Sequence, residues 1–209
     1  MTHSARANGR RAGKAEPDVT QRRWITGYFL CICVLLLTSG QDAAAERTVA
    51  PDWALATVDG RTLRLSEEAR QQTTILFFWA TWCPYCKALM PHLQSMRLEY
   101  GDSIEILAIN IREDGDPVEF IQSAGYDFTL LPDGDVVAET YGIEGTPGVI
   151  VIDSDRVVQF DLRRLPPLAP PASGQPATNI SKAAHLAPYW AAEIRKSIDS
   201  TMRSYPGAN

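Results

Sequence analysis

The chain has 209 residues, of which 45% are hydrophobic and 22% charged, a balance typical of one globular domain with additional segments. Its formal net charge of -5 hides an asymmetry, because residues 1–45 carry six basic and three acidic side chains and the remainder carries 14 and 22. Nucleic acid is bound through clustered Lys and Arg, so this acidic remainder excludes nucleic acid as an expected partner.

The first 45 residues have the pattern of an export signal. Residues 1–23 are polar and basic, and residues 24–41 carry no charge. A basic flank before an apolar run predicts a signal peptide or an N-terminal membrane anchor. Ala43-Ala44-Ala45 resembles a cleavage site and favours removal, whereas the long basic head favours retention, with membrane attachment by residues 24–41. In both cases the rest of the chain is expected in the periplasm, an extracytoplasmic compartment, either secreted or anchored to the inner membrane.

Two of the four cysteines, Cys31 and Cys33, lie in the apolar segment and are not expected to take part in chemistry. The exported part then keeps only Cys83 and Cys86. A disulfide scaffold in an oxidising compartment uses many cysteines, so one closely spaced pair predicts a reactive dithiol instead.

The exported part opens with a predicted hairpin and a short helix. Within residues 49–70, apolar and polar residues alternate after the turn signal Asp59-Gly60, which predicts two short paired strands. Ser66 is predicted to be the N-cap of the helix that follows.

The next segment joins a strand to a helix through two cysteines. Residues 75–79 are apolar and rich in aromatic side chains, which predicts a buried strand, and a helical pattern begins directly after Cys83. Cys83 would then face the free amides and the positive dipole of the first helical turn, which should lower the pKa of its thiol. Cys86 lies one turn further on, where the pair can close and reopen a disulfide. Pro84 suits the first turn because it has no N–H to satisfy.

Two other interpretations of this pair stay open at this point. A purely structural disulfide would place the same cysteines in contact without exchange. A zinc site needs four ligands, and beyond the pair only His92 and His185 offer soft ligands in the exported part. The position of the pair at a strand-to-helix junction favours redox exchange.

Strands and helices alternate through the following segment, which predicts an α/β domain. One helix opens at Asp116-Pro117 and stops at Gly125, and another is capped by Asp135 and ends at Gly142. Strands are predicted at residues 104–109, 128–131, 149–152 and 157–160.

The C-terminal part combines a proline-rich loop with a helix. Residues 165–176 contain five prolines, so an extended, exposed loop is predicted over residues 165–186. A final helix is predicted from about Pro188 to Met202, within residues 187–204. Its apolar side chains recur every four residues and are expected to pack on the sheet as core: Trp190, Ile194, Ile198 and Met202.

Trp82-Cys83-Pro84-Tyr85-Cys86 after a hydrophobic strand resembles the active site of a thioredoxin fold. Over about residues 49–162, a wider frame of motifs resembles the TlpA/ResA-like family of exported thiol–disulfide oxidoreductases. The frame comprises Ala50-Pro51-Asp52-Trp53, Phe78-Trp79-Ala80-Thr81-Trp82-Cys83, Met90-Pro91 and Gly145-Thr146-Pro147. The resemblance implies a thioredoxin-like α/β domain over residues 46–164. Its mixed central sheet would be flanked by helices, with an N-terminal hairpin, an inserted strand and helix, and the C-terminal helix as part of the same domain.

The resemblance also implies roles at the site. Cys83 would be the attacking thiolate and Cys86 the resolving thiol. The residues around and between them, Trp82, Pro84 and Tyr85, would tune their redox behaviour.

A cis peptide at Thr146–Pro147 would lie opposite the cysteines and bind a substrate chain as an added strand. This chain departs from its relatives in one respect: Phe77 and Leu89 stand where relatives carry an acid. Glu144 is the candidate proton relay in their place.

The expected function is that of an extracytoplasmic thiol–disulfide oxidoreductase that reduces protein disulfides. It would use no cofactor and no metal, and it would draw electrons from a membrane or periplasmic thiol donor. Cytochrome c maturation is one known role of the family. The alternatives are a disulfide oxidase or isomerase with the same site, or a copper-handling or other binding module, although related copper carriers use a longer Cys-x-x-x-Cys spacing.

Overall fold

A computed structural model describes residues 47–70, 72–169 and 178–204 of the chain. Two compact units are distinguished, residues 1–45 and 46–209, and the described residues all lie in the second. The predicted signal or anchor, including residues 24–41, lies outside the described residues. Within the described ranges, no helix has the length and apolar character needed to span a membrane.

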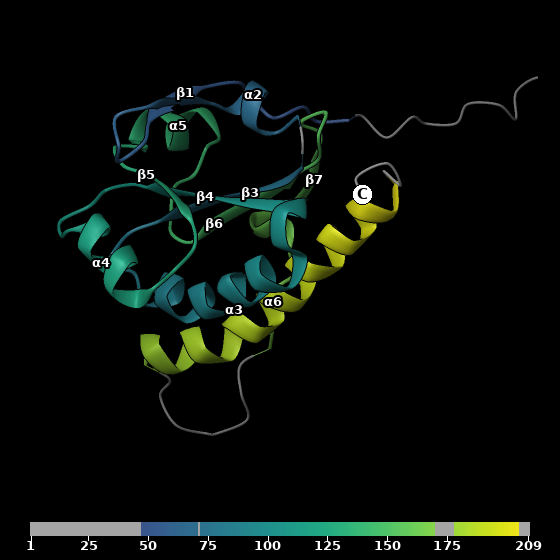
Figure 1. Cartoon of the computed structure of the whole chain (residues 1–209). Coiled ribbons are helices and arrows are strands. Elements are labelled where there is room, and N and C mark those ends of the chain that lie inside the picture. Colours follow the sequence, from purple (N-terminus) through teal and green to yellow (C-terminus); the bar gives the residue numbers. More distant parts are fainter. Residues whose placement is uncertain (1–46, 71, 170–177, 205–209) are drawn as a thin grey trace, which may run out of the picture. The chain divides into compact units, whose positions relative to one another are not determined.

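A five-stranded mixed sheet forms the centre of the domain, in the order β5-β4-β3-β6-β7 (Figure 1). β3 is parallel to β4 and antiparallel to β6, β4 is parallel to β5, and β6 is antiparallel to β7. The strands are β3 (Thr73–Trp79), β4 (Ile104–Asn110), β5 (Thr129–Leu131), β6 (Gly148–Ile152) and β7 (Val158–Asp161). The predicted α/β fold with a mixed sheet is confirmed, and each predicted strand of the sheet is found within two residues of its expected limits.

The central strand β3 is apolar throughout because both faces of the sheet are covered. All seven of its residues are buried. Ile75, Phe77 and Trp79 pack into the core on one face, and Leu76 and Phe78 pack into the core on the other. This alternation is the period of two that a strand imposes on its side chains.

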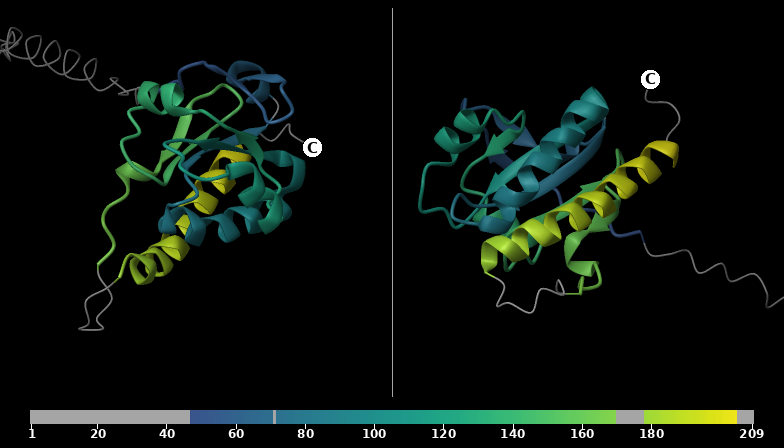
Figure 2. Two further views of the ribbon diagram at one scale, coloured as in Figure 1. Left: turned by 90° about the vertical axis from the view of Figure 1, so that its left-hand side faces the viewer. Right: turned by 90° about the horizontal axis from the view of Figure 1, so that it is seen from below.

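Helices and a hairpin cover the two faces of the sheet. One face is covered by α3 (Pro84–Tyr100), α4 (Pro117–Ala124) and the long α6 (Asn179–Ser204). Figures 1 and 2 show α3 and α6 side by side on this face. The other face is covered by α5 (Asp135–Thr140), the short α2 (Leu65–Glu68) and a hairpin of β1 (Ala54–Ala56) and β2 (Thr62–Arg64).

Several predicted local signals are confirmed. Gly60 in the hairpin turn has φ of 81°, a left-handed conformation that glycine adopts without a steric penalty. The carboxylate of Asp116 accepts the N–H groups of Val118 and Glu119 at 3.0 and 2.9 Å, so it caps α4 as predicted. Gly125 ends that helix in the left-handed region.

Two predicted N-caps are wrong, because the side chains of Ser66 and Asp135 bind residues far away in the chain instead of the amides of their own helices. α2 begins at Leu65, and Ser66 lies inside it, where its N–H and hydroxyl both donate to the carboxylate of Asp52. Asp135 is the first residue of α5 rather than its N-cap, which is Gly134. The Asp135 carboxylate instead accepts the N–H of Arg112 at 3.1 Å.

The final helix begins at Asn179, not near Pro188, so the proline-rich connection is shorter than predicted. The hydroxyl oxygen of Thr178 accepts the N–H of Ser181 and satisfies a free amide of the first turn. The helix continues through Pro188 because the turns before it bury Ala183 and Ala187. That packing outweighs the missing hydrogen bond of one proline.

The predicted stripe on this helix is confirmed in part. Ile194 and Ile198 are fully buried. Trp190 and Met202 are only half-buried at the edge of the core, and Ala191 takes the buried place beside Trp190. Alanine allows α6 to approach its neighbours closely, and the large indole is displaced to the rim.

Candidate active site

The two cysteines lie where β3 ends and α3 begins, as predicted. Cys83 is the N-cap of α3 with an extended backbone, and Pro84 is the first helical residue. Cys83 and Cys86 form a disulfide with a Cα–Cα distance of 5.3 Å. Both are buried, and the Cys83 Sγ accepts the N–H of Cys86 at 3.1 Å. A sulfur at this position faces the free amides and the positive dipole of the helix, which favours its thiolate when the disulfide opens.

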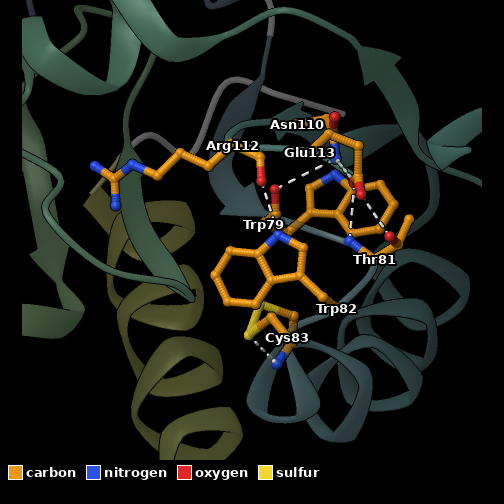
Figure 3. The surroundings of a disulfide bond; sticks show 8 residues. Trp79, Thr81, Trp82, Cys83, Asn110, Arg112 and Glu113 are labelled. Atoms are coloured by element: carbon orange, nitrogen blue, oxygen red, sulfur yellow. Dashed lines mark hydrogen bonds between the residues drawn. A yellow bond between two sulfur atoms is a disulfide. The ribbon is translucent and has the colours of Figure 1, made fainter. Parts of the chain in front are cut away.

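Two aromatic side chains flank the disulfide. Trp82 is 48% exposed, and its indole N–H donates to the backbone carbonyl of Arg112 at 2.7 Å (Figure 3). Tyr85, between the cysteines, packs against Trp190 of α6 with ring centroids 6.2 Å apart. Trp190 was predicted only as core, and its contact with Tyr85 brings it to the site.

The Thr146–Pro147 peptide is cis, as the resemblance implied. Gly148, the next residue, pairs with Phe78 of β3. Because β6 runs antiparallel to β3, Thr146 and Pro147, just before β6, lie at the same edge of the sheet as the end of β3 and the Cys83 that follows it. The fold therefore brings the two predicted motifs to the same edge.

A carboxylate that was not predicted lies beside the loop before Cys83. Glu113 accepts the N–H of Thr81 at 2.9 Å, the hydroxyl of Thr81 at 2.5 Å and the amide of Asn110 at 2.5 Å (Figure 3). It also accepts the N–H groups of Asp114 and Gly115, at 3.0 and 2.9 Å. Burial raises the pKa of Glu113, but these hydrogen bonds outweigh burial and lower the pKa from 4.5 to about 2.

Arg112, next to this carboxylate, adopts a left-handed backbone with φ of 50°. Its guanidinium donates to the carbonyl of Ile143 at 2.8 Å and to the carbonyl of Glu144. Figure 3 shows this guanidinium pointing away from the hydrogen bonds around Glu113. Arg112 thus contacts the segment that leads into the cis peptide.

The remaining residues considered for the site differ in their exposure to solvent. Glu144 has an exposed side chain, and its contact with Arg112 is made through its backbone carbonyl, so its role as a proton relay stays a prediction. Phe77 and Leu89 are fully buried among apolar residues. Over residues 47–70, 72–169 and 178–204, no group of three or more His, Cys, Asp or Glu side chains is arranged to hold a metal ion.

Sequence reasoning missed Asn110, Arg112 and Glu113. One signal was available, because Asn110 is the last residue of the buried strand β4, which runs parallel to β3, and Arg112 and Glu113 lie just after it. Loops at the carboxyl ends of parallel strands meet at one edge of a sheet and commonly carry functional residues.

Comparison with known proteins places this site in a family. The model of the AhpC/TSA family matches residues 47–161. The thiol-disulfide oxidoreductase ResA of Geobacillus thermodenitrificans is 34% identical over 120 residues, which cover 56% of this chain and 68% of that protein. ResA of Halalkalibacterium halodurans is 33% identical over 147 residues, covering 65% of this chain and 83% of that protein.

A solved structure supports the same assignment. The Chlorobium tepidum protein described as a thiol:disulfide interchange protein, DsbE, is 28% identical, with a TM-score of 0.50 over 55% of this chain and 82% of that one. The family match covers more than half of the chain and includes the cysteine pair and the cis proline. The chain therefore belongs to the AhpC/TSA family, as a thiol–disulfide oxidoreductase with the thioredoxin fold.

Proposed function

We propose that this oxidoreductase reduces disulfides of other proteins outside the cytoplasm. The observation that carries the proposal is the placement of Cys83 at the start of α3, with Cys86 one turn behind it and the cis Thr146–Pro147 peptide at the same edge of the sheet. This arrangement offers a nucleophilic sulfur, an internal resolving sulfur and backbone for a substrate chain.

The reaction is a two-step exchange. The Cys83 thiolate attacks one sulfur of the substrate disulfide, forms a mixed disulfide and releases the other substrate sulfur as a thiolate. The Cys86 thiolate then attacks the Cys83 sulfur, closes the Cys83–Cys86 bond and releases the reduced substrate. Two electrons pass to the substrate, and a membrane or periplasmic thiol donor returns them by the reverse exchange with the enzyme disulfide.

The surroundings of Cys83 support the reducing direction. A strongly oxidising site such as that of DsbA depends on a stabilised reduced form with a very acidic thiol. In the part of the chain that the structure describes, the Cys83 sulfur accepts one hydrogen bond, from the backbone N–H of Cys86. The nearby cation of Lys87 lies over the ring of Phe120, 5.4 Å from its centroid. Against this direction stands the Pro84-Tyr85 pair, which favours the alternative of an oxidase or isomerase.

The proposed setting is the periplasm, with cytochrome c maturation as a role to be tested. The basic and apolar pattern of residues 1–45 supports export. Two relatives carry the name ResA and a structural relative the name DsbE, which supports membership of the same functional group.

The proposed role of Glu144 as a proton relay is tested separately. A Glu144→Gln variant with an unchanged pH–rate profile would rule that role out.

The deciding experiment is the reduction potential of the Cys83–Cys86 pair in the full chain, equilibrated against glutathione and dithiothreitol buffers. We expect a value near that of thioredoxin, about -270 mV. A value near that of DsbA, about -120 mV, would overturn the reducing direction and favour the oxidase.

A Cys86→Ser variant is expected to accumulate a mixed disulfide with a protein substrate, visible on non-reducing gels. Loss of any measurable couple, with copper retained on purification, would favour the binding module.

A further inference from the structure

The turn of residues 110–113 contacts three separate parts of the active site. Glu113 accepts both the N–H and the hydroxyl of Thr81, in the loop that leads into Cys83. The carbonyl of Arg112 accepts the indole N–H of Trp82. The guanidinium of Arg112 donates to the carbonyls of Ile143 and Glu144, just before the cis peptide. One short turn therefore joins the loop before Cys83 to the loop that contains the cis Thr146–Pro147 peptide, which we call the proline loop.

The backbone of Arg112 shows that this turn is held in place by its surroundings. A non-glycine residue at φ of 50° lies in a sparsely populated region and is kept there only by compensating contacts. Its N–H donates to the carboxylate of Asp135, its carbonyl accepts from Trp82, and its side chain spans to the proline loop. The N–H, the carbonyl and the guanidinium of Arg112 are thus directed to three different segments around the site.

We propose that Arg112 is a positioning residue that holds the Thr146–Pro147 loop against Cys83 for the capture of an extended substrate segment. This inference rests on the proposed function and deepens it. A guanidinium is a planar fork that can donate to two neighbouring carbonyls at once and so fixes their direction as well as their distance. With Ile143 and Glu144 fixed in this way, the backbone of the next residues is presented to a substrate strand in one orientation.

The neighbouring residue Glu113 connects the same turn to the loop before Cys83. Glu113 ties the turn to the loop before Cys83, while Arg112 ties it to the proline loop. We expect the loss of the guanidinium to leave the Glu113–Thr81 contacts and the disulfide intact, because none of them involves the Arg112 side chain. It should weaken the binding of a substrate chain without changing the chemistry of the cysteines.

The test compares two disulfide probes in the full chain carrying Cys31→Ser and Cys33→Ser, so that Cys83 and Cys86 supply the only thiols. Each reaction is a single turnover of the pre-reduced enzyme, with KM taken as the half-saturating probe concentration and kcat as the maximal rate of that turnover. The first is a small aromatic disulfide, dithiobis(nitrobenzoate), which needs only the thiolate of Cys83. The second is an extended peptide that carries a mixed disulfide with glutathione at its central cysteine and needs the backbone of the proline loop. For Arg112→Ala, which loses two charge-assisted hydrogen bonds, we expect the KM for the peptide to rise about tenfold. The kcat for the peptide and the rate with the small probe should stay within about twofold of wild type.

Two further variants separate positioning from general damage. Arg112→Lys keeps the charge but not the fork, so we expect the KM for the peptide to rise about threefold. Arg61→Ala removes an exposed arginine that pairs with Asp59 in the distant hairpin turn, and should match wild type with both probes. Melting temperatures are measured for every variant, and the assays are run well below them.

Each outcome decides the inference. A raised KM for the peptide with an unchanged rate for the small probe supports it. An unchanged KM in Arg112→Ala, or a parallel loss with both probes in Arg112→Lys, overturns it. A wild-type chain that reacts with neither probe would overturn the proposed function itself, which is a different result from an active wild type with an insensitive Arg112.

Discussion

Glu113 accepts hydrogen bonds from two side chains and three backbone amides while remaining partly accessible to water. These donors stabilise the ionised carboxylate, and so its pKa lies near 2, below the ordinary value of 4.5. Because the pKa is depressed on folding, the ionised group adds stability above about pH 4.5, and that stability is lost as the pH falls toward about 2. A single side chain thus makes the loop before Cys83 sensitive to acid.

Glu113→Gln tests this contribution. Solvent screening reduces the effect of a partly exposed group, so we expect a loss of about 1–2 kcal/mol in the free energy of unfolding near neutral pH. The difference from wild type should shrink as the pH falls toward about 2, where the wild-type carboxylate also becomes protonated. Urea denaturation at both pH values measures it.

The control for this prediction is Glu139→Gln, which removes an exposed carboxylate from α5. It should leave stability within about 0.5 kcal/mol of wild type at both pH values. A Glu113→Gln variant that follows the same pH dependence as wild type would contradict the role of this carboxylate.

At the scale of the elements, helix starts depend on whether the capping oxygen is local or distant. α4 begins where the carboxylate of Asp116 meets two free amides of its own first turn. α2 begins where Asp52, on a separate segment, accepts the N–H and hydroxyl of Ser66. Only the first case is visible from neighbouring residues, which is why the caps predicted at Ser66 and Asp135 failed.

Asp116→Ala should destabilise the protein by about 1 kcal/mol, because it exposes two amides of α4 that lose their partner. The midpoint of urea unfolding should fall while its slope stays constant. Asp114→Ala, two residues earlier, is the matched control: its backbone N–H still donates to Glu113, and no loss is expected. Equal effects from both variants would contradict the capping role.

At the scale of the whole molecule, α6 packs into the same hydrophobic core as α3 and one face of the sheet. Ile194 and Ile198 are fully buried in the same core as Ile75, Phe77 and the two cysteines. Tyr100 of α3 donates to Asp199 of α6 at 2.7 Å, and Tyr85 packs on Trp190 at the other end of α3. The helix after the proline-rich segment is therefore expected to unfold together with the rest of the domain.

Ile198→Ala tests this expectation. A cavity at a fully buried position should reduce the free energy of unfolding by about 2–5 kcal/mol. Ile180→Ala, on the same helix at a position 74% exposed, should change it by less than about 0.5 kcal/mol. Circular dichroism and tryptophan fluorescence should report one shared transition for each variant, and two separate transitions would show that α6 is not part of the cooperative unit.

The residue pattern alone predicted the α/β fold class and the strand-to-helix placement of Cys83 and Cys86, and the resemblance of its motifs to a family implied the cis Thr146–Pro147 peptide. Those features depend on apolar patterns, turn residues and motifs that lie within a few positions of one another. Only the folded chain shows the contacts of Arg112 and Glu113, the start of α6 at Asn179 and the contact of Trp190 with Tyr85. The contacts join residues far apart in the chain, such as Thr81 with Glu113 and Arg112 with Glu144, and α6 starts early because Ala183 and Ala187 are buried. The parallel register that sets Trp79 opposite Asn110 brings the first of these pairs together, and no local pattern of residues encodes that register.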